Sequence, residues 1–329
     1  MLIEAKHLER DFTVYNQRSS FHMLHQMLRR KGEKRKVVKD ISLKIDEGEF
    51  VGYLGPNGAG KSTTIKMLSG VLSPSAGSIQ VMGLDPVKDR KKHAKNIGVL
   101  YGQRTQLWWD LPLMDSFQLL TSIYQVPERL FKQRLNQFIE MLEMENFLYT
   151  PVRQLSLGQR MKGEVVATLI HNPKIVFLDE PTIGLDILAK KRIQKFLKYL
   201  NEEHNTTILL TSHNIDDVDQ LCKRIILIDN GEIKFDGPKE KLSELTNSEK
   251  TLAVEVEALH SDTISTFAFK PAEVRGNTLY FHIADDADVP EMITNLSKHY
   301  NILKIEISEV DIEKILEEVY TSKQYKIVN

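Results

Sequence analysis

Short runs of apolar residues alternate with helical patterns from residue 40 to about residue 235. Four of these runs are almost continuously apolar, at Phe50–Leu54, 175–178, 208–210 and 225–228. Continuous apolarity is typical of strands that are buried on both faces, as in a parallel sheet. Strands that alternate with helices predict an α/β fold with a mainly parallel sheet.

One helix of this pattern lies between the second and third runs. Its apolar side chains recur at helical spacing on one face, at Ile193, Phe196, Leu197 and Leu200. Asp186 precedes this face, and its short acceptor side chain is suited to cap the first turn of a helix. We therefore expect a helix that begins just after Asp186.

Residues 115–149 follow a different, mostly helical pattern, in which Phe138, Leu142 and Phe147 stand among many polar positions. We interpret a wider segment, at about 103–170, as a helical subdomain inserted into the α/β core.

The pattern changes beyond Gly237 and Pro238. A polar helical stretch ends around Ser248, and apolar residues then recur at every second position, at 252, 254 and 256, at 279, 281 and 283, and at 303, 305 and 307. This period is that of strands with one buried face, and amphipathic helices are expected near 290–299 and 309–320. The sequence thus predicts two domains, at 1–240 and 241–329, of which the second is a small α+β domain.

The composition is ordinary, with 41% hydrophobic residues, 27% charged residues and a net charge of −1. So small a charge produces no field that favours nucleic acid, and no such partner is expected. The single cysteine, Cys222, excludes an internal disulfide and fits a reducing compartment. No secretory signal is visible, and no run approaches the roughly 20 apolar residues of a spanning helix. These features predict a cytoplasmic protein whose contact with a membrane is peripheral.

A glycine-rich motif follows the first apolar run. Residues 55–62 fit the pattern G-x-x-x-x-G-K-[ST], and a helical pattern continues to Leu68. Glycines let backbone N–H groups close around phosphate oxygens, and the helix N-terminus adds a positive partial charge. Lys61 is expected to reach the β- and γ-phosphates of ATP, and the Ser62 hydroxyl to bind Mg²⁺. The residues predicted to hold the nucleotide are Gly55, Pro56, Asn57, Gly58, Ala59, Gly60, Lys61, Ser62 and Thr63.

Two acids end the apolar run at 175–178. Asp179 and Glu180 are expected at the carboxyl edge of the sheet, where folds of this kind bind their ligands. Asp179 is predicted to contact Mg²⁺, and Glu180 to act as the general base that polarises the attacking water. The alternative is a surface turn with two solvated acids, which the nearby phosphate loop makes the weaker interpretation.

Four further motifs resemble those of the ATP-binding cassette (ABC) transporter family. Leu155-Ser156-Leu157-Gly158-Gln159 is similar to the family's LSGGQ signature, and Ile183-Gly184-Leu185-Asp186 to its D-loop. Gln103 falls where the family has its Q-loop, and His213 where it has the switch histidine. With the phosphate loop and the carboxylate pair, these motifs stand in family order within residues 1–240. The resemblance implies the fold of a P-loop NTPase cassette and the activity of a transporter ATPase.

In this family two cassettes pair head to tail, and each signature closes the phosphate loop of the other. The resemblance implies that Ser156, Gly158 and Gln159 contact ATP held by a second copy of the chain or by a homologous ATPase subunit. It implies that Gln103 contacts Mg²⁺ or the attacking water and that His213 bonds the γ-phosphate, although a lone histidine after a strand is otherwise more often structural. It also implies that hydrolysis drives separate integral membrane permease subunits from the inner face of the cell membrane.

One position departs from the family pattern. Leu157 stands where the signature usually has its first glycine. Its side chain need not touch phosphate if the donors are Ser156 and Gly158, so we expect activity to survive with altered packing at the dimer seam.

The family stacks adenine on an aromatic side chain near the start of the chain. Phe12 is best placed for this role, with Tyr15 as its rival. A stack of this kind is worth about 1–3 kcal/mol. Packing in the core is the alternative role for Phe12.

A segment at about 16–38 is interpreted as an insertion into the cassette. Its apolar Phe21, Leu24, Met27 and Leu28 share a helical face, and a basic stretch follows. Such a segment is suited to rest on anionic lipid or to dock on the permease. The simpler alternative is a solvated surface excursion.

Trp108 and Trp109 follow Gln103, in the region that meets the permease in this family. Large aromatic side chains anchor interfaces of this kind. We nevertheless expect at least one of them to be buried in the core, and the partner surface is a hypothesis.

A finer resemblance, in residues 107–112 and the insertion, is to exporter ATPases for viologens or other drugs, so export is the expected direction. Two other functions stay open. A non-transport cassette ATPase would act on nucleic acid or ribosomes, but such chains usually carry long coiled coils or tandem cassettes. A regulatory module would have lost hydrolysis, against which the intact Glu180, His213 and Ser156 argue.

Overall fold

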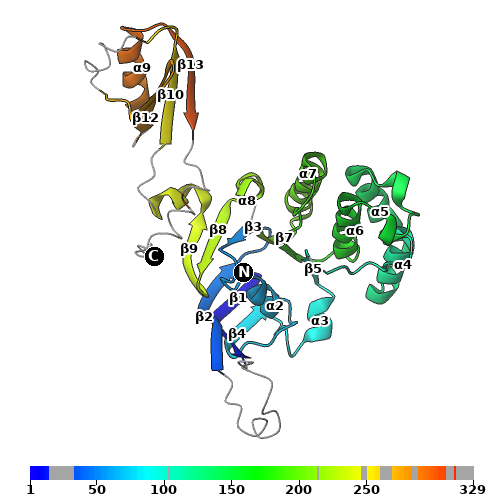
Figure 1. Cartoon of the computed structure of the whole chain (residues 1–329). Helices are drawn as coiled ribbons and strands as arrows, with labels where there is room; N and C mark the ends of the chain where they lie inside the picture. The colour runs from blue at the N-terminus through cyan, green and yellow to red at the C-terminus, as the bar shows by residue number, and fades with distance from the viewer. Residues whose placement is uncertain are drawn as a thin grey trace, which may run out of the picture. The chain divides into compact units, whose positions relative to one another are not determined.

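The computed structural model of the chain describes residues 1–14, 33–102, 104–212, 215–245, 250–259, 269–283 and 288–308, together with residue 315. The chain divides into two compact units, Met1–Lys239 and Glu240–Asn329. Figure 1 shows the elements of both units.

The first unit is built around a six-stranded sheet with the strand order β5-β6-β7-β3-β8-β9. Strands from β5 to β8 pair in parallel, and β9 pairs antiparallel with β8 at one edge. The strands are β3 (Phe50–Leu54), β5 (Ile97–Tyr101), β6 (Ile175–Asp179), β7 (Thr207–Thr211), β8 (Arg224–Asp229) and β9 (Glu232–Pro238). All residues of β3 and β7 are buried. The four apolar runs are therefore confirmed as strands of a mainly parallel sheet.

A second, antiparallel sheet has the order β2-β1-β4. Its strands are β1 (Ile3–Val14), β2 (Glu33–Ile45) and β4 (Ala76–Val81). The sequence pattern did not predict β1 or β4. Residues 33–38, which the sequence assigned to the insertion, belong instead to β2 and pair with β1. The predicted helical face from Phe21 to Leu28 lies outside the described residues.

One hydrophobic core joins the two sheets to helix α2 (Lys61–Leu68). Fully buried side chains come from β1 (Ile3), from α2 (Ile65) and from the six-stranded sheet (Phe177 and Leu209). Each such side chain contributes about 1.5–3 kcal/mol through its removal from water. The packing fixes α2, and with it the loop that precedes the helix, against the carboxyl ends of the parallel strands.

Helices surround the parallel sheet. They are α3 (Arg90–Ala94), α4 (Leu113–Tyr124), α5 (Glu128–Leu142), α6 (Leu157–Leu169), α7 (Ile187–His204) and α8 (Ile215–Leu221), with short 3₁₀ turns η1 (Glu145–Phe147) and η2 (Val152–Gln154). Figure 1 shows α4, α5 and α6 gathered beyond strand β5. Phe138 of α5 contacts Phe196 of α7 edge to face, with 5.1 Å between the ring centroids.

The predicted start of helix α7 is confirmed. Asp186 is its N-cap, and the Oδ1 of Asp186 accepts a hydrogen bond of 2.8 Å from the backbone N–H of Ala189. The face from Ile193 to Leu200 is buried as the sequence predicted. The cap matters for the site because it fixes the chain just after the D-loop.

The second unit holds a four-stranded antiparallel sheet in the order β11-β12-β10-β13. Its elements are η3 (Lys239–Leu245), β10 (Lys250–Val256), β11 (Glu273–Arg275), β12 (Thr278–Ile283), α9 (Val289–Ser297) and β13 (Ile302–Ser308). Side chains of β10 and β12 form a core with α9. The three predicted strands and the helix near 290–299 are confirmed, whereas the short β11 was not predicted. The helix expected near 309–320 lies outside the described residues, apart from the buried Ile315.

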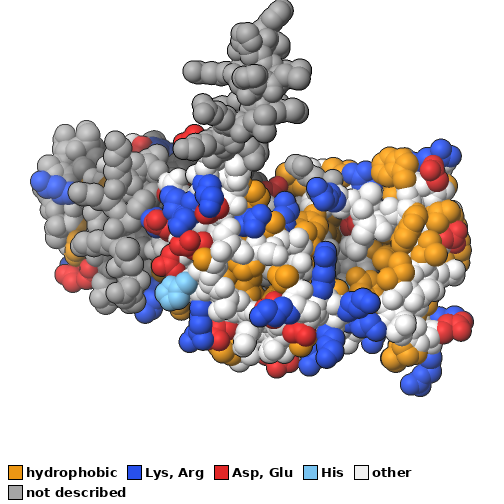
Figure 2. Space-filling view, turned by 90° about the horizontal axis from the view of Figure 1, so that it is seen from below, with side chains coloured by type: hydrophobic (Ala, Val, Ile, Leu, Met, Phe, Trp, Pro, Cys, Tyr) orange, Lys and Arg blue, Asp and Glu red, His pale blue; other side chains and the backbone are white. Residues whose placement is uncertain are grey.

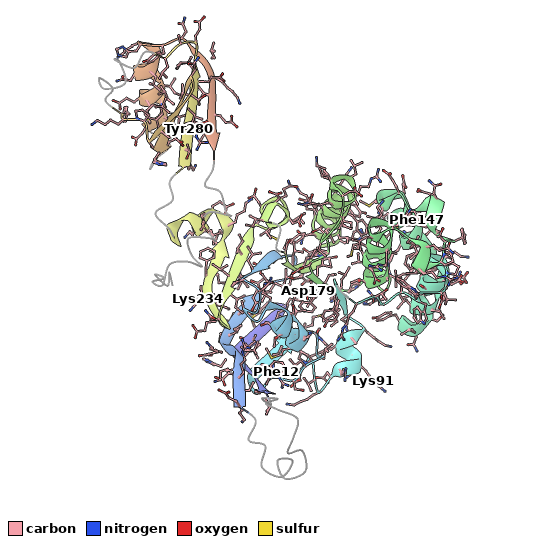
Figure 3. The ribbon with its side chains drawn as sticks, viewed as in Figure 1. Phe12, Lys91, Phe147, Asp179, Lys234 and Tyr280 are labelled. Carbon is pink, nitrogen blue, oxygen red and sulfur yellow. The ribbon has the colours of Figure 1, made fainter. Side chains whose placement is uncertain are left out.

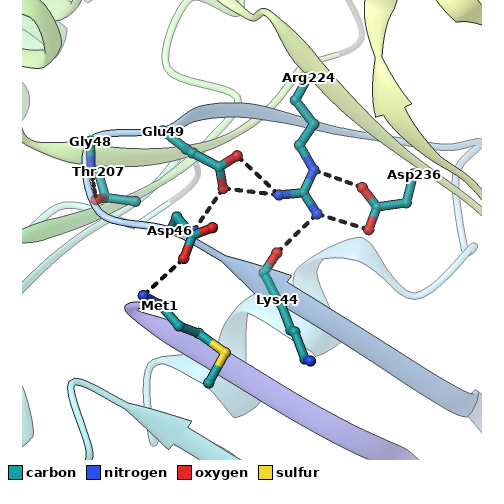
Figure 4. A network of polar contacts seen from close by, with 8 residues as sticks. All are labelled: Met1, Lys44, Asp46, Gly48, Glu49, Thr207, Arg224 and Asp236. Carbon is teal, nitrogen blue, oxygen red and sulfur yellow. Dashed lines mark hydrogen bonds and ion pairs between the residues drawn. The ribbon is translucent and has the colours of Figure 1, made fainter.

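Arg224 of β8 joins four parts of the first unit (Figure 4). Its guanidinium donates to both carboxylate oxygens of Asp236 on β9, at 2.7 and 2.9 Å, and to Glu49 at 2.9 and 3.1 Å. A further hydrogen bond of 2.9 Å reaches the backbone oxygen of Lys44 at the end of β2. Asp236 and Glu49 hold the pKa of Arg224 above its ordinary value. Fork-shaped contacts of this kind tie the two sheets together.

Arg224→Ala is expected to lower the stability of the first unit by about 2 kcal/mol, because two carboxylates and a carbonyl lose their shared donor. The melting temperature should fall by about 5 °C, measured by thermal shift. Arg153→Ala is the matched control, since Arg153 makes one ion pair of 3.4 Å with Asp110 and both side chains are exposed. Equal shifts in the two variants would contradict the structural role of Arg224.

Candidate nucleotide site

Residues 55–60 form the loop between β3 and α2. A Cβ atom at Gly55 would lie 2.2 Å from the backbone oxygen of Ile228, so no side chain fits there. Gly58 and Gly60 have φ angles of 84° and 111°, which favour glycine. The glycines therefore allow the tight turn that leads into the N-terminus of α2, where backbone N–H groups lack partners within the helix.

Lys61 lies buried at the start of α2. Its Nζ donates to the backbone oxygens of Gly55, at 2.6 Å, and Pro56, at 3.0 Å. Burial lowers the pKa of Lys61, while the charges of Glu180 and Asp179 raise it. The ammonium thus lies against the loop, and the negative charges of both carboxylates act on it. A phosphate in the loop would offer this ammonium a stronger acceptor than a carbonyl, so the residues fit the phosphate chain of ATP.

Asp179 lies at the carboxyl end of β6 (Figure 3). Its Oδ1 accepts a hydrogen bond of 2.6 Å from the hydroxyl of Thr211 on β7, and its backbone oxygen accepts one of 2.9 Å from Gly102. The neighbouring strands therefore hold Asp179 on both sides. Its carboxylate shares this edge of the sheet with the loop after β3, as the sequence predicted from the two strand ends.

Glu180 has a left-handed backbone conformation, with φ at 57°. Its N–H donates to the backbone oxygen of Thr211 at 3.0 Å. Such a conformation costs a residue with a side chain on the order of 1–3 kcal/mol, and strain of this kind gathers at functional sites. The backbone at Glu180 is thus held by β7 in a turn directly after the end of β6.

Two predicted residues, Gln103 and His213, lie outside the described residues, as does Tyr15. The residues beside them are described. Gly102 bonds to Asp179, and Ser212 follows strand β7. The chain around both predicted residues therefore comes to the edge of the sheet where Asp179 lies.

Asp217, in α8, is a buried acid that the sequence did not point to. It is 1% exposed, and its Oδ2 accepts from the hydroxyls of Thr182, at 2.5 Å, and Ser212, at 3.1 Å. Its Oδ1 accepts from the side-chain amide of Gln194 at 2.6 Å, and Lys190 Nζ lies 3.2 Å away. One carboxylate thus joins the segment after Glu180, the residue before His213 and helix α7.

Glu164, in α6, is a second buried acid of this kind. Its carboxylate accepts from the hydroxyl of Thr105 and, at 3.2 Å, from the N–H of Gln106. The side-chain amide of Gln106 donates to Thr168 of α6 at 2.6 Å. Burial raises the pKa of Glu164. Helix α6 therefore holds the segment that follows Gln103.

The signature starts helix α6. The Oγ of Ser156 accepts from the N–H of Gln159 at 3.2 Å, and the side chain of Gln159 accepts from the N–H of Ser156 at 2.9 Å. This reciprocal cap leaves the Ser156 hydroxyl with its own proton to donate. A Cβ atom at Gly158 would lie 3.4 Å from the Cβ of Ala189, so the signature packs closely on the start of α7.

Leu157 lies against the D-loop of its own chain. A Cβ atom at Gly184 would lie 3.0 Å from a methyl carbon of Leu157. The departure from the family pattern thus places an apolar side chain over the D-loop, which is consistent with the expected change in packing.

Phe12 is 37% exposed on β1, and the guanidinium of Arg10 lies 4.9 Å from its ring centroid (Figure 3). The alternative of core packing is therefore wrong. Exposure leaves the ring available for stacking, and its role toward adenine stays a prediction.

Trp108 and Trp109 are 38% and 47% exposed, so the expectation that at least one is buried in the core is also wrong. The N–H of Trp108 bonds to Ser116 of α4, and the oxygen of Trp109 accepts from Arg153. The main chain is thus anchored to α4, through the buried Ser116, and to Arg153, and both rings remain exposed.

Among the described residues, no three or more His, Cys, Asp and Glu side chains are grouped as metal ligands. Mg²⁺ in nucleotide sites typically takes one or two protein oxygens together with phosphates and water, so Ser62 and Asp179 fit that need. Within the described part of the chain, no helix combines the length and the apolarity needed to cross a bilayer.

Comparison with known proteins gives one family. Residues 38–183 match the family described as ABC transporter. The ABC transporter ATP-binding protein NatA of Bacillus subtilis is 38% identical over 224 residues, which cover 67% of this chain and 91% of that protein. The Nod factor export ATP-binding protein I of Cupriavidus metallidurans is 33% identical over 258 residues, covering 76% and 82%.

A solved structure has the same fold. It is a dimeric ATP-binding cassette in a post-hydrolysis state with ADP and Pi bound, with a TM-score of 0.60 and 26% identity, over 72% of this chain and 98% of that one. Phosphate loop, carboxylate strand and signature thus stand in the fold in which that cassette binds its nucleotide. The chain belongs to the ABC transporter family, in which it is an ATP-binding subunit with ATPase activity.

Proposed function

We propose that two copies of the chain pair head to tail around two molecules of MgATP, and that hydrolysis drives a separate membrane permease that exports its cargo. The main support is a cluster of exposed aliphatic side chains at the signature and D-loop, which we name the seam cluster. It consists of Leu157, Ile183, Ile187 and Leu188, which are 42%, 51%, 72% and 68% exposed. Exposed apolar surface of this kind marks contact sites. A second copy would cover it when its phosphate loop meets the signature.

Within each copy, residues 55–63 hold the phosphates, with Lys61 as the cation. Ser62 and Asp179 supply oxygens for Mg²⁺, which neutralises charge between the β- and γ-phosphates when it is bound. Glu180 accepts a proton from the attacking water. Phe12 stacks on the adenine.

The remaining groups complete the site from other segments. Ser156, Gly158 and Gln159 of one copy donate hydrogen bonds to the γ-phosphate of ATP held by the other. His213 bonds the same phosphate within its own chain, and Gln103 contacts Mg²⁺ or the water. Short neutral donors suit this role because they add no charge that would hold the products.

The permease is proposed to dock on the helical region, by which we mean α4, α5 and α6 with the loops that join them to the sheet. Figure 2 shows hydrophobic side chains gathered over this region on the right of the view. The exposed large apolar side chains of this region are Trp108, Trp109, Leu119, Ile123 and Tyr149. Aromatic anchors on an exposed apolar surface are typical of protein interfaces. This docking would hold the chain at the inner face of the membrane.

Export is proposed from the relative described as a Nod factor export protein. The permease forms the transport path in this family, so the cargo is set by that partner.

Ser156→Arg tests the head-to-tail site. The variant should bind ATP in its own phosphate loop but lose hydrolysis by about 10²-fold, because the arginine intrudes on the site of the partner. Fluorescent-nucleotide binding and phosphate release measure the two effects.

Arg153→Ala, three positions earlier and outside the helix cap, is the control and should hydrolyse ATP at the wild-type rate. A Ser156→Arg variant that hydrolyses ATP at the wild-type rate would rule out the proposed pairing.

A further inference from the structure

Strand β13 forms one edge of the sheet in the second unit. It pairs with β10 on one side, and among the described strands none pairs with its other side. Its side chains are exposed, with Leu303 at 62%, Ile305 at 42% and Ile307 at 47%. An exposed apolar edge offers a row of unpaired N–H and C=O groups to a further strand. The edge therefore needs either protection or a partner.

The apolar side chains of β13 extend the core face of the sheet. Ile305 stands opposite Val254 and Ile307 opposite Leu252, so each pair points to the same face. Val254 and Leu252 are fully buried under α9, whereas the isoleucines are not. The core face of the sheet thus continues past the described helix to an open edge.

The charged side chains of β13 set the register in which a second copy can pair with this edge. Lys304 and Glu306 lie on the opposite face, 2.8 Å apart, with exposures of 63% and 58%. In an antiparallel pair, opposed residues point to the same face. When two identical strands pair about a two-fold axis, one residue therefore lies at the axis and opposes its own copy.

Of the antiparallel registers centred on Lys304, Ile305 or Glu306, only the one centred on Ile305 is favourable. With Ile305 at the axis, Lys304 opposes the partner's Glu306, and this pair occurs twice. With Lys304 or Glu306 at the axis, that residue opposes its own copy. Opposite charges across strands contribute roughly 0.2–1 kcal/mol each, and like charges destabilise. The sequence of the edge is therefore complementary to itself about Ile305.

We propose that two copies of this chain pair antiparallel through β13, with Ile305 at the two-fold axis, so that their sheets become continuous. The occupant of the edge is a second copy because the charges of the strand match its own sequence in this register. The contact uses no nucleotide, so it holds in both the ATP-bound and the ATP-free chain.

One consequence of this pairing rests on the proposed function. Two edge strands make a small interface, but a second contact between molecules already joined is intramolecular and gains from effective concentration. Pairing at β13 would thus keep two cassettes together after the ATP-bound interface opens.

Cysteine cross-linking tests the register in the full chain. Opposed Cα atoms at the axis lie about 5 Å apart, within the separation of about 7 Å that a disulfide allows. Ile305→Cys should therefore form a disulfide-linked dimer under mild oxidation, with and without MgATP. Cys222 is buried, at 2% exposure, and does not compete.

Ile307→Cys is the matched control on the same face of the same strand. In the proposed register its copy lies four residues along the partner strand, about 14 Å away, and it should stay monomeric on a non-reducing gel. No dimer from Ile305→Cys, or equal dimer from both variants, would overturn the proposal. These outcomes leave the head-to-tail site untouched, because the cross-link is expected without nucleotide as well as with it.

Charge exchange provides an independent test. Lys304→Glu, added to Ile305→Cys, should reduce the cross-linked fraction by about tenfold, because two pairs of like charges then face each other. Adding Glu306→Lys should restore cross-linking. If the exchange does not restore it while circular dichroism shows an intact fold, the register is wrong.

Discussion

Glu180→Gln is expected to bind ATP with unchanged affinity and to lose hydrolysis by about 10²–10⁴-fold. Glutamine has the shape of glutamate but its amide cannot take a proton from water, so only the proposed base is removed. The backbone at Glu180, with φ at 57°, is held by the hydrogen bond from its N–H to Thr211, which the change leaves intact. Nucleotide affinity is measured by fluorescence titration, and turnover by phosphate release.

Glu128→Gln is the matched control for this prediction. Glu128 lies in the first turn of α5, is 77% exposed and forms an ion pair of 2.7 Å with Lys132 of the same helix. Its replacement should leave turnover unchanged. Near-wild-type hydrolysis by Glu180→Gln would remove Glu180 from the role of base. A loss of ATP binding in the same variant would instead assign Glu180 to binding.

The strands of the parallel sheet could be predicted from sequence because burial on both faces leaves continuous apolar runs. Strand β1 could not. It alternates charged and apolar residues, and its register shifts at Leu8 and Arg10 break the period of two. Its partner β4 lies more than sixty residues away, so the local sequence does not indicate that the two strands pair. The three residues of β11 are all exposed and carry no apolar pattern.

The phosphate loop and the carboxylate pair could be predicted because each is a local motif next to a buried strand. The two buried acids could not. Glu164 and Asp217 receive hydrogen bonds from segments that lie far from them in the sequence, at Thr105 and at Thr182. An acid in an amphipathic helix looks like any solvated charge until the fold brings its donors together.

The two tryptophans illustrate the opposite error. Core burial was the expected role for at least one, because large apolar rings are usually buried. Their main chain bonds to the buried Ser116 of α4 and to Arg153, and both rings remain exposed. Backbone bonding of a loop is a property of the folded chain, and the local sequence carries no sign of it.

Asp217 is the point at which the segments around the proposed chemistry are joined. Through Thr182 it holds the chain just after Glu180, and through Ser212 the residue before His213. It contacts neither the phosphate loop nor the signature through any hydrogen bond described for it. Its expected role is therefore to position the base and the switch residue relative to each other, with little influence on nucleotide binding.

Asp217→Asn should lower kcat for ATP by about 10–100-fold while KM stays within about twofold, because a buried acceptor becomes a donor facing donors, at a cost of about 1–3 kcal/mol. Asp216→Asn is the control: Asp216 is the neighbour in α8, is 77% exposed and lies 3.7 Å from the same Lys190. Steady-state kinetics give the two constants, and a thermal melt separates misfolding from misplacement. A role in stability alone predicts a lower melting temperature with unchanged kcat for the folded enzyme, and a role in binding predicts a higher KM. Either result would contradict positioning, since only a displaced base or switch residue slows turnover without weakening the hold on ATP.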